Sequence, residues 1–227
     1  MAKVFIGVGH GGSDSGAVGK GGLLEKSLNL SIATACAQAL RRSGVTVQLS
    51  RTADQDDPVA EEVAECNSFA PDLAVDVHNN AGGGDGAEAY YSRAGGTGKQ
   101  LAVNILDQLT ALGQRSRGAK TRLTASGADY YAFIRETKAP AVIVECAFVD
   151  TQDVELIDTE AERIAAGEAI ARGILQTLGI AYKPEKTLTE PRKLYRVQVG
   201  AYADKANAQA QVERLARAGF EAIITTS

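Results

Sequence analysis

Residues 4–12, VFIGVGHGG, form a short apolar run that passes directly into a glycine-rich loop. The apolar residues between 27 and 43 then recur at the spacing of one helix face, and the run VTVQL at 45–49 returns to a strand pattern. A strand, a helix and a second strand in this order are typical of a parallel sheet that is covered by helices. The opening stretch therefore predicts an α/β fold.

The same alternation continues along most of the chain. Strands are expected at residues 4–8, 45–49, 73–77, 87–92 and 141–144, and helices at 27–43, 58–69, 97–112 and 161–178. We predict a mainly parallel, twisted sheet with helices on both faces, which forms one large domain in residues 1–180.

Periodicity stops between residues 181 and 193, where prolines and charged residues predict an exposed linker. Beyond this linker, a strand at 195–199, a helix at 205–218 and a strand at 220–225 predict a small βαβ unit. We place this unit in residues 194–227, and it is too small to be stable alone.

Composition excludes several classes of protein. The 227 residues are 44% hydrophobic and 23% charged, which is typical of globular domains rather than disordered or fibrous chains. The net charge is -4, so nucleic acid is not an expected partner. No apolar stretch reaches the ~18 residues needed to span a bilayer, so we expect no membrane partner.

The charge is not evenly distributed along the chain. From Lys183 onward there are 8 Lys and Arg and 5 Asp and Glu, so this tail has a net charge of +3 and the larger domain has a net charge of -7.

The chain contains only two histidines, and both follow expected strands. His10 lies two residues after the first strand, and His78 directly follows the run at 73–77. In open α/β sheets, ligands bind where the carboxyl ends of the strands meet. A single histidine is as often structural as functional, but two histidines in matching positions favour a shared site.

Two glutamates are expected at the same edge of the sheet. Glu25 opens the first helix, where a favourable interaction with the helix dipole is the ordinary explanation. Glu145 ends the buried apolar run at 141–144, where a carboxylate costs free energy unless it is paired or used. Two imidazoles and one carboxylate form a common set of catalytic zinc ligands, and the remaining carboxylate would be a general acid or base.

The loop at residues 10–22, HGGSDSGAVGKGG, is rich enough in glycine to be compared with phosphate-binding loops. A P-loop has the pattern GxxxxGK[ST], but Asp14 stands at the position of the first glycine and Gly21 at that of the Ser or Thr. No GxGxxG opens a helix directly after the strand either. We expect the glycines to let the backbone turn sharply and approach a metal or a substrate.

Several segments together resemble the zinc-dependent N-acetylmuramoyl-L-alanine amidases of bacterial autolysins and phage endolysins. The matching segments are GHGG at 9–12, LEK at 24–26, DLAVDVHNNA at 72–81, RGAK at 117–120 and TKAPAVIVE at 137–145. The resemblance implies one zinc ion held by His10, Glu25 and His78, with Glu145 as the catalytic carboxylate. The implied reaction is hydrolysis of the amide bond between N-acetylmuramic acid and the L-alanine of the peptidoglycan stem peptide.

In that reaction, zinc would activate a water molecule and polarise the scissile carbonyl, and Glu145 would pass the proton of the water to the leaving amine. We expect Asn80, Arg117 and Lys120 to contact the substrate, although a solvated loop charge is the simpler explanation for Lys120. Two alternatives stay open: another zinc hydrolase of the cell wall, such as a carboxypeptidase or a deacetylase, and an inactive peptidoglycan-binding protein.

Three positions depart from the family pattern. Glu62 stands where the family usually has an arginine, five residues before the asparagine at 67. Asn79 replaces the usual alanine after the second histidine, and Cys146 is unusual after Glu145. None of the three belongs to the expected metal set, and we interpret Cys146 as a buried packing residue rather than a nucleophile.

The carboxyl-terminal unit resembles the first half of a SPOR domain, a peptidoglycan-binding module, on the run LYRVQVGAY at 194–202 and the helix that follows. Half of this βαββαβ module has an unpaired sheet edge and an uncovered apolar face, so we predict a homodimer through two such halves. Truncation of a longer chain is the alternative.

The amino-terminal residues do not form a recognisable signal peptide. We therefore expect synthesis in the cytoplasm and action on the cell wall after holin-mediated or lytic release, as for an endolysin. A sporulation enzyme of the mother cell is the alternative.

Overall fold

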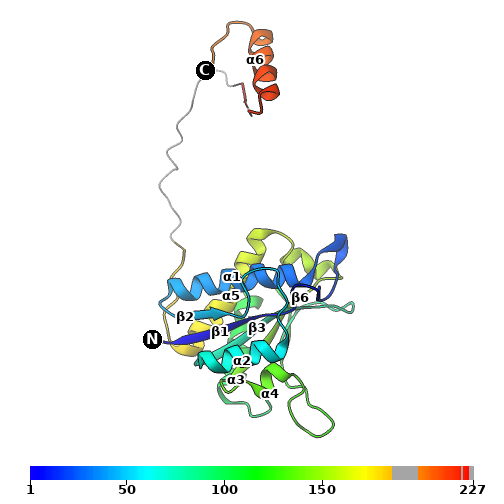
Figure 1. Cartoon of the computed structure of the whole chain (residues 1–227), viewed down its shortest axis with the longest axis vertical. Helices are drawn as coiled ribbons and strands as arrows, with labels where there is room; N and C mark the ends of the chain where they lie inside the picture. Colours follow the sequence, from blue (N-terminus) through cyan, green and yellow to red (C-terminus); the bar gives the residue numbers. More distant parts are fainter. Residues whose placement is uncertain (186–198, 221, 225–227) are drawn as a thin grey trace. The chain divides into compact units, whose positions relative to one another are not determined.

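A six-stranded sheet forms the centre of residues 1–185 (Figure 1). The structure, a computed structural model, describes residues 1–185, 199–220 and 222–224. The strands follow the order β2-β1-β3-β6-β4-β5; β4 is antiparallel to β6, and every other neighbouring pair is parallel. The predicted α/β class and the mainly parallel sheet are therefore confirmed.

The elements of this unit lie close to their predicted places. The strands are β1 (Lys3–Val8), β2 (Thr46–Leu49), β3 (Leu73–Asn80), β4 (Ala87–Tyr91), β5 (Ser116–Lys120) and β6 (Ala141–Phe148). The helices are α1 (Glu25–Arg42), α2 (Val59–Phe69), α3 (Gly96–Thr110), α4 (Ala132–Glu136) and α5 (Glu160–Leu178), with 3₁₀ turns at Lys20–Gly22 and Gln152–Leu156.

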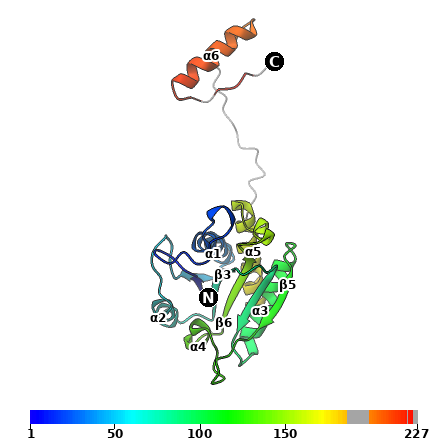
Figure 2. The same ribbon diagram turned by 90° about the vertical axis from the view of Figure 1, so that its right-hand side faces the viewer.

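One face of the sheet packs against α1, α3 and α5, and the resulting core is large and apolar. Successive strand residues point to opposite faces, so Val4, Ile6 and Val8 of β1 all enter this core. Figure 2 shows α1 and α5 on this side of the sheet and α2 and α4 on the other. We call the side under α1, α3 and α5 the apolar face.

Helix α5 lies in the middle of the apolar face, and two glycines let it approach its neighbours. A Cβ atom on Gly167 would lie 2.4 Å from the carbonyl oxygen of Ile32 in α1, and one on Gly173 would lie 2.6 Å from the Cα of Ile105 in α3. A capping box between Thr159 and Glu162 begins the helix. The close contacts explain why the sequence uses small residues in a helix interior, where glycine is otherwise unfavourable.

The opposite face is smaller and changes character along the strands. Under α2 and α4 it is apolar, with Phe5, Phe133 and Ile143 in one cluster. Nearer the carboxyl ends of the parallel strands it carries polar side chains. These are Asp76, His78, Glu88 and Glu145, with the side-chain-free Gly7 beside Asp76. We call this side the polar face, and it leads into the candidate site.

Two strands are longer than predicted, and two elements were not predicted. Strand β3 continues to Asn80 and β6 to Phe148, so His78 and Glu145 lie within strands rather than after them. Strand β5 is the polar edge sequence SRGAK, which lacks apolar alternation, and α4 has only five residues. Neither segment carries the hydrophobic periodicity on which sequence-based prediction depends.

The second unit, residues 186–227, is described by itself. It contains α6 (Lys205–Arg217), which confirms the predicted helix, and the side chain of Asp204 caps its first turn by accepting from the amide of Ala206 at 2.7 Å. Residues 222–224 are not in a strand, although a strand was expected at 220–225. Residues 195–198 of the other expected strand lie outside the described residues.

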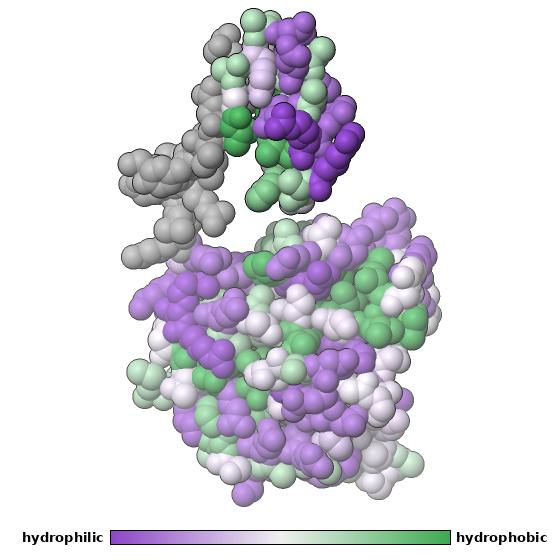
Figure 3. All heavy atoms as spheres, turned by 45° about the horizontal axis from the view of Figure 1, so that its top comes forward, coloured by the Kyte–Doolittle hydropathy of each residue, from purple (hydrophilic) through white to green (hydrophobic). Residues whose placement is uncertain are grey.

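The surface of the molecule is mixed in character. Figure 3 shows hydrophilic and hydrophobic residues side by side on the visible face of the larger unit, and hydrophilic side chains gathered on one side of the small unit. Within the residues that the structure describes, no helix has both the length and the apolar character needed to cross a membrane.

Candidate metal centre and active site

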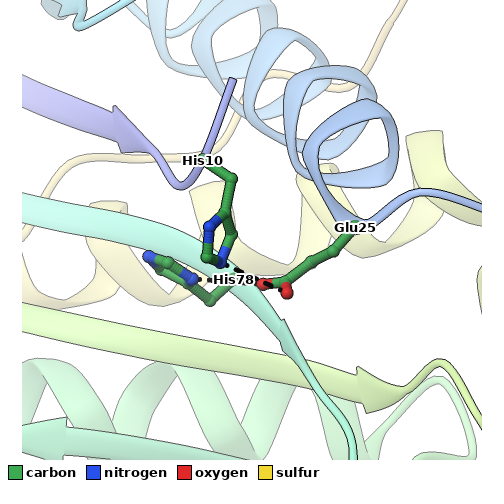
Figure 4. A group of neighbouring side chains, drawn as sticks. All are labelled: His10, Glu25 and His78. Atoms are coloured by element: carbon green, nitrogen blue, oxygen red, sulfur yellow. Dashed lines mark hydrogen bonds and ion pairs between the residues drawn. The ribbon is translucent and has the colours of Figure 1, made fainter. Parts of the chain in front are cut away.

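Three of the predicted residues meet at the carboxyl-terminal edge of the sheet (Figure 4). His10 lies in the loop after β1, Glu25 is the first residue of α1, and His78 is in β3. Glu25 lies between the two rings: its Oε2 is 3.3 Å from His10 Nε2, and its Oε1 is 3.1 Å from His78 Nδ1. One ligand atom from each residue lies within 4.8 Å of the other two, which is compact enough to hold one metal ion.

Two glycines make room for this arrangement. A Cβ atom on Gly9 would lie 2.2 Å from Cε1 of the His78 ring. Gly16, whose φ is 63°, would bring a Cβ atom to 2.6 Å from His10 Cδ2 and 2.7 Å from Glu25 Oε2. The glycine loop therefore brings the backbone against the rings, and only residues without a side chain fit there.

Carboxylates also hold the nitrogen atoms that face away from the centre. Asp14 Oδ2 lies 2.7 Å from His10 Nδ1, and Asp76 Oδ2 lies 3.1 Å from His78 Nε2. Each ring thus has one nitrogen bonded to an outer carboxylate and one directed at Glu25. A metal-binding histidine usually donates its second ring N–H to such a group, so the residues present fit a zinc ion bound by two nitrogens and one carboxylate.

Glu25 stays ionised in this setting. Burial by itself would raise its pKa, but hydrogen bonds with His10 and His78 outweigh burial and hold the pKa of Glu25 well below its usual range. The backbone amides of Ala17 and Asn79 also donate to its two oxygens, at 2.8 and 3.0 Å. The carboxylate is therefore held in place in its negatively charged form.

Glu145 lies beside this centre on the polar face. It is paired in register with His78 on the neighbouring strand, and its Oε2 is buried without a hydrogen-bond partner. Burial raises the pKa of Glu145 to about 7. A carboxylate with a pKa near neutrality and a free oxygen atom can accept a proton and release it again at physiological pH.

The three predicted substrate contacts meet at a residue that we did not predict, Glu88. On Glu88 Oε1, Asn80 Nδ2 donates at 3.0 Å; on Oε2, Arg117 Nε donates at 2.7 Å and Lys120 Nζ at 2.5 Å. Glu88 is paired in register with Glu145, so this cluster adjoins the candidate base. Burial would raise the pKa of Glu88, but the bonds from Lys120, Arg117 and Tyr90 hold it at about 2.

The sequence contained one signal for Glu88: a lone charged side chain between the alanines of an expected strand. Arg117 and Lys120 together carry one more unit of charge than Glu88. Their side chains are 35% and 36% exposed. The cluster therefore presents a net positive surface beside Glu145.

Arg51 is a second residue that sequence analysis missed. It is 2% exposed, and its guanidinium group donates to the carbonyl oxygens of Val8 at 3.0 Å, Gly9 at 3.3 Å and Lys26 at 2.7 Å. These bonds join the end of β1 to the start of α1. Arg51 therefore fixes the two segments that carry His10 and Glu25, a role that only the folded contacts reveal.

Two of the departures from the family pattern have structural explanations. The Asn79 amide donates to Asn29 Oδ1 at 2.8 Å, and Asn29 in turn donates to the carbonyl oxygen of Gly9 at 3.0 Å. Cys146 is 1% exposed in the core of the apolar face, on the side of the strand opposite to Glu145. Burial raises the pKa of its thiol, which supports a packing role.

Comparison with known proteins agrees with this geometry. CwlM, an N-acetylmuramoyl-L-alanine amidase of Bacillus licheniformis, is 36% identical to this chain over 229 residues, which cover 99% of the chain and 85% of that protein. The sporulation-specific amidase of Bacillus subtilis is 35% identical, with coverage of 99% and 84%. The structure of the amidase AmiC2 of Nostoc punctiforme matches with a TM-score of 0.71 at 29% identity, covering 78% of this chain and 97% of that one.

Two family matches complete the comparison. Residues 168–226 match the SPOR domain, in a match that begins within α5. Residues 4–176, about three quarters of the chain, match the N-acetylmuramoyl-L-alanine amidases, which confirms the predicted resemblance. The chain thus belongs to the N-acetylmuramoyl-L-alanine amidase family, enzymes that hydrolyse peptidoglycan between N-acetylmuramic acid and L-alanine.

Proposed function

We propose that the described site carries out this amide hydrolysis with Glu145 as general base and general acid, beside a zinc ion held by His10, Glu25 and His78. The observation that carries the proposal is the place of Glu145. Its unpartnered, buried oxygen lies on the strand next to His78, where a reacting water molecule would be bound. Burial raises the pKa of this carboxylate to about 7, which suits proton transfer.

The donor set favours zinc over harder cations. Two imidazole nitrogens and one carboxylate suit zinc, whereas magnesium and calcium prefer oxygen ligands alone. When bound, zinc supplies Lewis-acid activation of the water and the scissile carbonyl. Glu25 contributes the negative charge of the set, and the outer carboxylates of Asp14 and Asp76 keep one nitrogen of each ring free for the metal.

Glu145 moves the proton. In its ionised form it accepts a proton from the attacking water, and in its protonated form it donates that proton to the nitrogen of the leaving L-alanine. Both steps need a pKa near the working pH, and burial on the polar face supplies it. The chain has no third histidine to share this role.

Arg117, Lys120 and Asn80 would orient the substrate. Glu88 holds all three at fixed positions next to Glu145, and the cluster keeps one unit of positive charge in excess. We infer that it receives a negatively charged group of the stem peptide, since two cations at a partly buried position favour an anion.

Digestion of purified peptidoglycan with product analysis tests the reaction. We expect mass spectrometry to show free stem peptides with a new amino-terminal L-alanine, and glycan strands that keep their acetyl groups. Shortened peptides or released acetate would assign the site to a carboxypeptidase or a deacetylase. Intact peptidoglycan with zinc-loaded protein would leave only a binding role.

The carboxyl-terminal unit would bind peptidoglycan as part of the proposed domain plan: a catalytic domain at 1–180, a linker at 181–193 and a half SPOR-like unit at 194–227. We also propose that two chains form a homodimer through this unit. Large apolar side chains at Phe220 and Ile223 are 64% and 86% exposed, which favours a partner surface. Light scattering at micromolar concentration tests it: a dimer mass is expected, and a monomer mass would contradict it.

The place of action is also a proposal. The family acts on the cell wall, and we propose that this chain reaches the wall when the producing cell lyses or is opened by a holin. The sporulation-specific relative favours the alternative, a sporulation enzyme of the mother cell. Fractionation of the producing cells over time tests the proposed release, and wall-bound enzyme in intact growing cells would contradict it.

A further inference from the structure

Two buried carboxyl groups lie behind the metal centre, and the proposed mechanism does not use either as a reacting group. Asp76 in β3 is 3% exposed and Glu62 in α2 is 4% exposed. Asp76 Oδ1 and Glu62 Oε1 are both buried without a hydrogen-bond partner. Unpaired buried carboxylates are costly, so a chain that keeps two together has a reason for them.

The two groups are neighbours because one glycine leaves them space. A Cβ atom on Gly7 would lie 2.0 Å from Glu62 Oε1 and 2.7 Å from Asp76 Oδ1, so both oxygens lie over the bare backbone of β1. The other oxygen of Asp76, Oδ2, lies 3.1 Å from His78 Nε2. Glu62 therefore lies next to Asp76, and Asp76 lies next to His78, so these three side chains connect α2 with the metal centre.

The contact with Asp76 fixes the orientation of the His78 ring. Gly9 lets the His78 ring lie against the backbone just after β1, and Asp76 is two residues before His78 on the same face of β3. A hydrogen bond from Nε2 to Asp76 leaves Nδ1 as the nitrogen that faces Glu25. His10 is arranged in the opposite sense, with Nδ1 on Asp14 and Nε2 facing Glu25.

We propose that Asp76 and Glu62 are a positioning pair for the metal ligand His78. Asp76 holds the ring so that Nδ1 faces the metal, and the carboxyl group of Glu62 supports Asp76 from the side away from His78. The inference rests on the proposed metal centre and extends it to residues outside the ligand set. It also gives a role to Glu62, at the position where the family usually has an arginine.

The chemistry requires Glu62 to be the protonated member. Burial and the nearby charge of Asp76 raise the pKa of Glu62 well above its usual value, so its O–H can donate to Asp76. Asp76 then accepts from Glu62 on one oxygen and from His78 on the other. In this arrangement neither buried oxygen of the pair is left unpaired.

Zinc affinity, measured by competition with a chromogenic chelator, gives the first test. Asp76→Asn keeps the shape but loses the charge, and we expect its affinity to fall roughly 10–100-fold. Asp14→Asn is the matched control, since Asp14 makes the same contact with His10 but 67% of its side chain is exposed; its loss should be smaller. Equal affinity of Asp76→Asn and wild type would overturn the proposal.

Glu62 is tested by a conservative and a non-conservative change. Glu62→Gln keeps an N–H donor towards Asp76 and should bind zinc within about threefold of wild type, whereas Glu62→Leu removes the donor and should approach Asp76→Asn. If Glu62→Leu binds zinc as tightly as wild type, Glu62 has no positioning role. Two zinc ions per wild-type chain, with the second lost in Glu62→Gln, would instead make the pair a cation site and overturn the positioning role.

A second measurement needs no variant. With only two histidines, ¹⁵N-histidine labelling of the zinc-loaded wild-type chain gives four ring-nitrogen signals. We expect opposite assignments: a protonated Nδ1 on one ring and a protonated Nε2 on the other. The same protonated nitrogen on both rings would overturn the proposal, whereas failure of the wild type to bind zinc would overturn the metal centre itself.

Discussion

The two faces of the sheet are built from alternate residues of the same strands, yet they differ in what they bury. On the apolar face, Val142, Val144 and Cys146 of β6 pack into a large hydrocarbon core. On the polar face, the alternate residues of the same strand are the apolar Ile143 and the ionisable Glu145. One strand thus contributes to stability through one set of side chains and to chemistry through the other.

The difference lies in what burial does on each side. On the apolar face it removes hydrocarbon from water, which stabilises the fold by about 25 cal/mol per Å². On the polar face burial raises the pKa of Glu62 and Glu145. At Glu88 the hydrogen bonds from Lys120 and Arg117 outweigh burial and lower the pKa. The polar face is therefore costly to build, and the apolar face opposite offsets that cost.

The largest expected effect comes from the polar face. Glu145→Gln removes the proton acceptor, and we expect turnover to fall by roughly 10²–10⁴-fold while zinc content stays the same. The control is Cys146→Ala, the next residue along the strand, which points to the apolar face and should keep turnover. Assays on peptidoglycan with parallel metal analysis check this, and wild-type turnover in Glu145→Gln would contradict the assignment.

A truncation on the apolar face should have the complementary result. Ile170→Ala in α5 creates a cavity in the large core, and we expect the free energy of unfolding to fall by about 2–5 kcal/mol. Ile164→Ala in the same helix is the control, because Ile164 is 42% exposed and should lose less than about 0.5 kcal/mol. Chemical denaturation measures both, and equal losses would show that α5 does not form the core as described.

The raised pKa of Glu145 predicts a pH dependence of stability in metal-free protein. Between the ordinary value of 4.5 and about 7, the folded chain binds more protons at this site than the unfolded chain, so its contribution to stability falls as pH rises. The slope is at most about 1.4 kcal/mol per pH unit. Glu145→Gln has no such group, so its stability relative to wild type should rise across this window when both are unfolded in chelator. A constant difference would rule out the shift.

The smallest effect is expected at Glu88, where the pKa is lowered to about 2. Its ionised form stabilises the fold above pH 4.5, and that contribution is lost as pH falls towards 2. We expect wild type to be more stable than Glu88→Gln by about 1 kcal/mol at pH 7, and the difference to be smaller at pH 3 and to vanish only below about pH 2. Thermal unfolding at the two pH values measures this, and a larger gap at pH 3 would contradict the charge pairing.

Much of the fold could be predicted because the apolar face leaves a clear pattern. Strands such as β1 and helices such as α1 carry regular hydrophobic spacing, and both were found within a few residues of their bounds. The polar face weakens that pattern. His78 and Glu145 interrupt their strands with polar side chains, so the predicted strands stop too early.

The candidate site was also predictable only in part. The sequence predicted that His10, Glu25 and His78 meet, because histidine is scarce and strand ends lie at one edge, and the structure brings the three side chains together. Glu88, Arg51 and the pair of Glu62 and Asp76 were missed, since each acts through partners that are distant in the sequence. Glu62 is 14 residues from Asp76 along the chain, and only the packing of α2 over Gly7 brings the two together.

The reversed direction of β4 has a consequence for how this enzyme can vary. In the metal half of the sheet, the site is made by the ends of β1, β3 and β6. In the other half, Glu88 lies near the start of β4, which runs antiparallel to β6, and Arg117 and Lys120 lie along β5, which follows the direction of β4. The connections at residues 92–95 and 121–131 consequently begin at the far edge of the sheet, and of the three partners of Glu88 only Lys120 adjoins one of them. The connections at residues 81–86 and 111–115 lie at the edge of the metal centre, and we expect changes of length or sequence there to alter specificity for different cell walls.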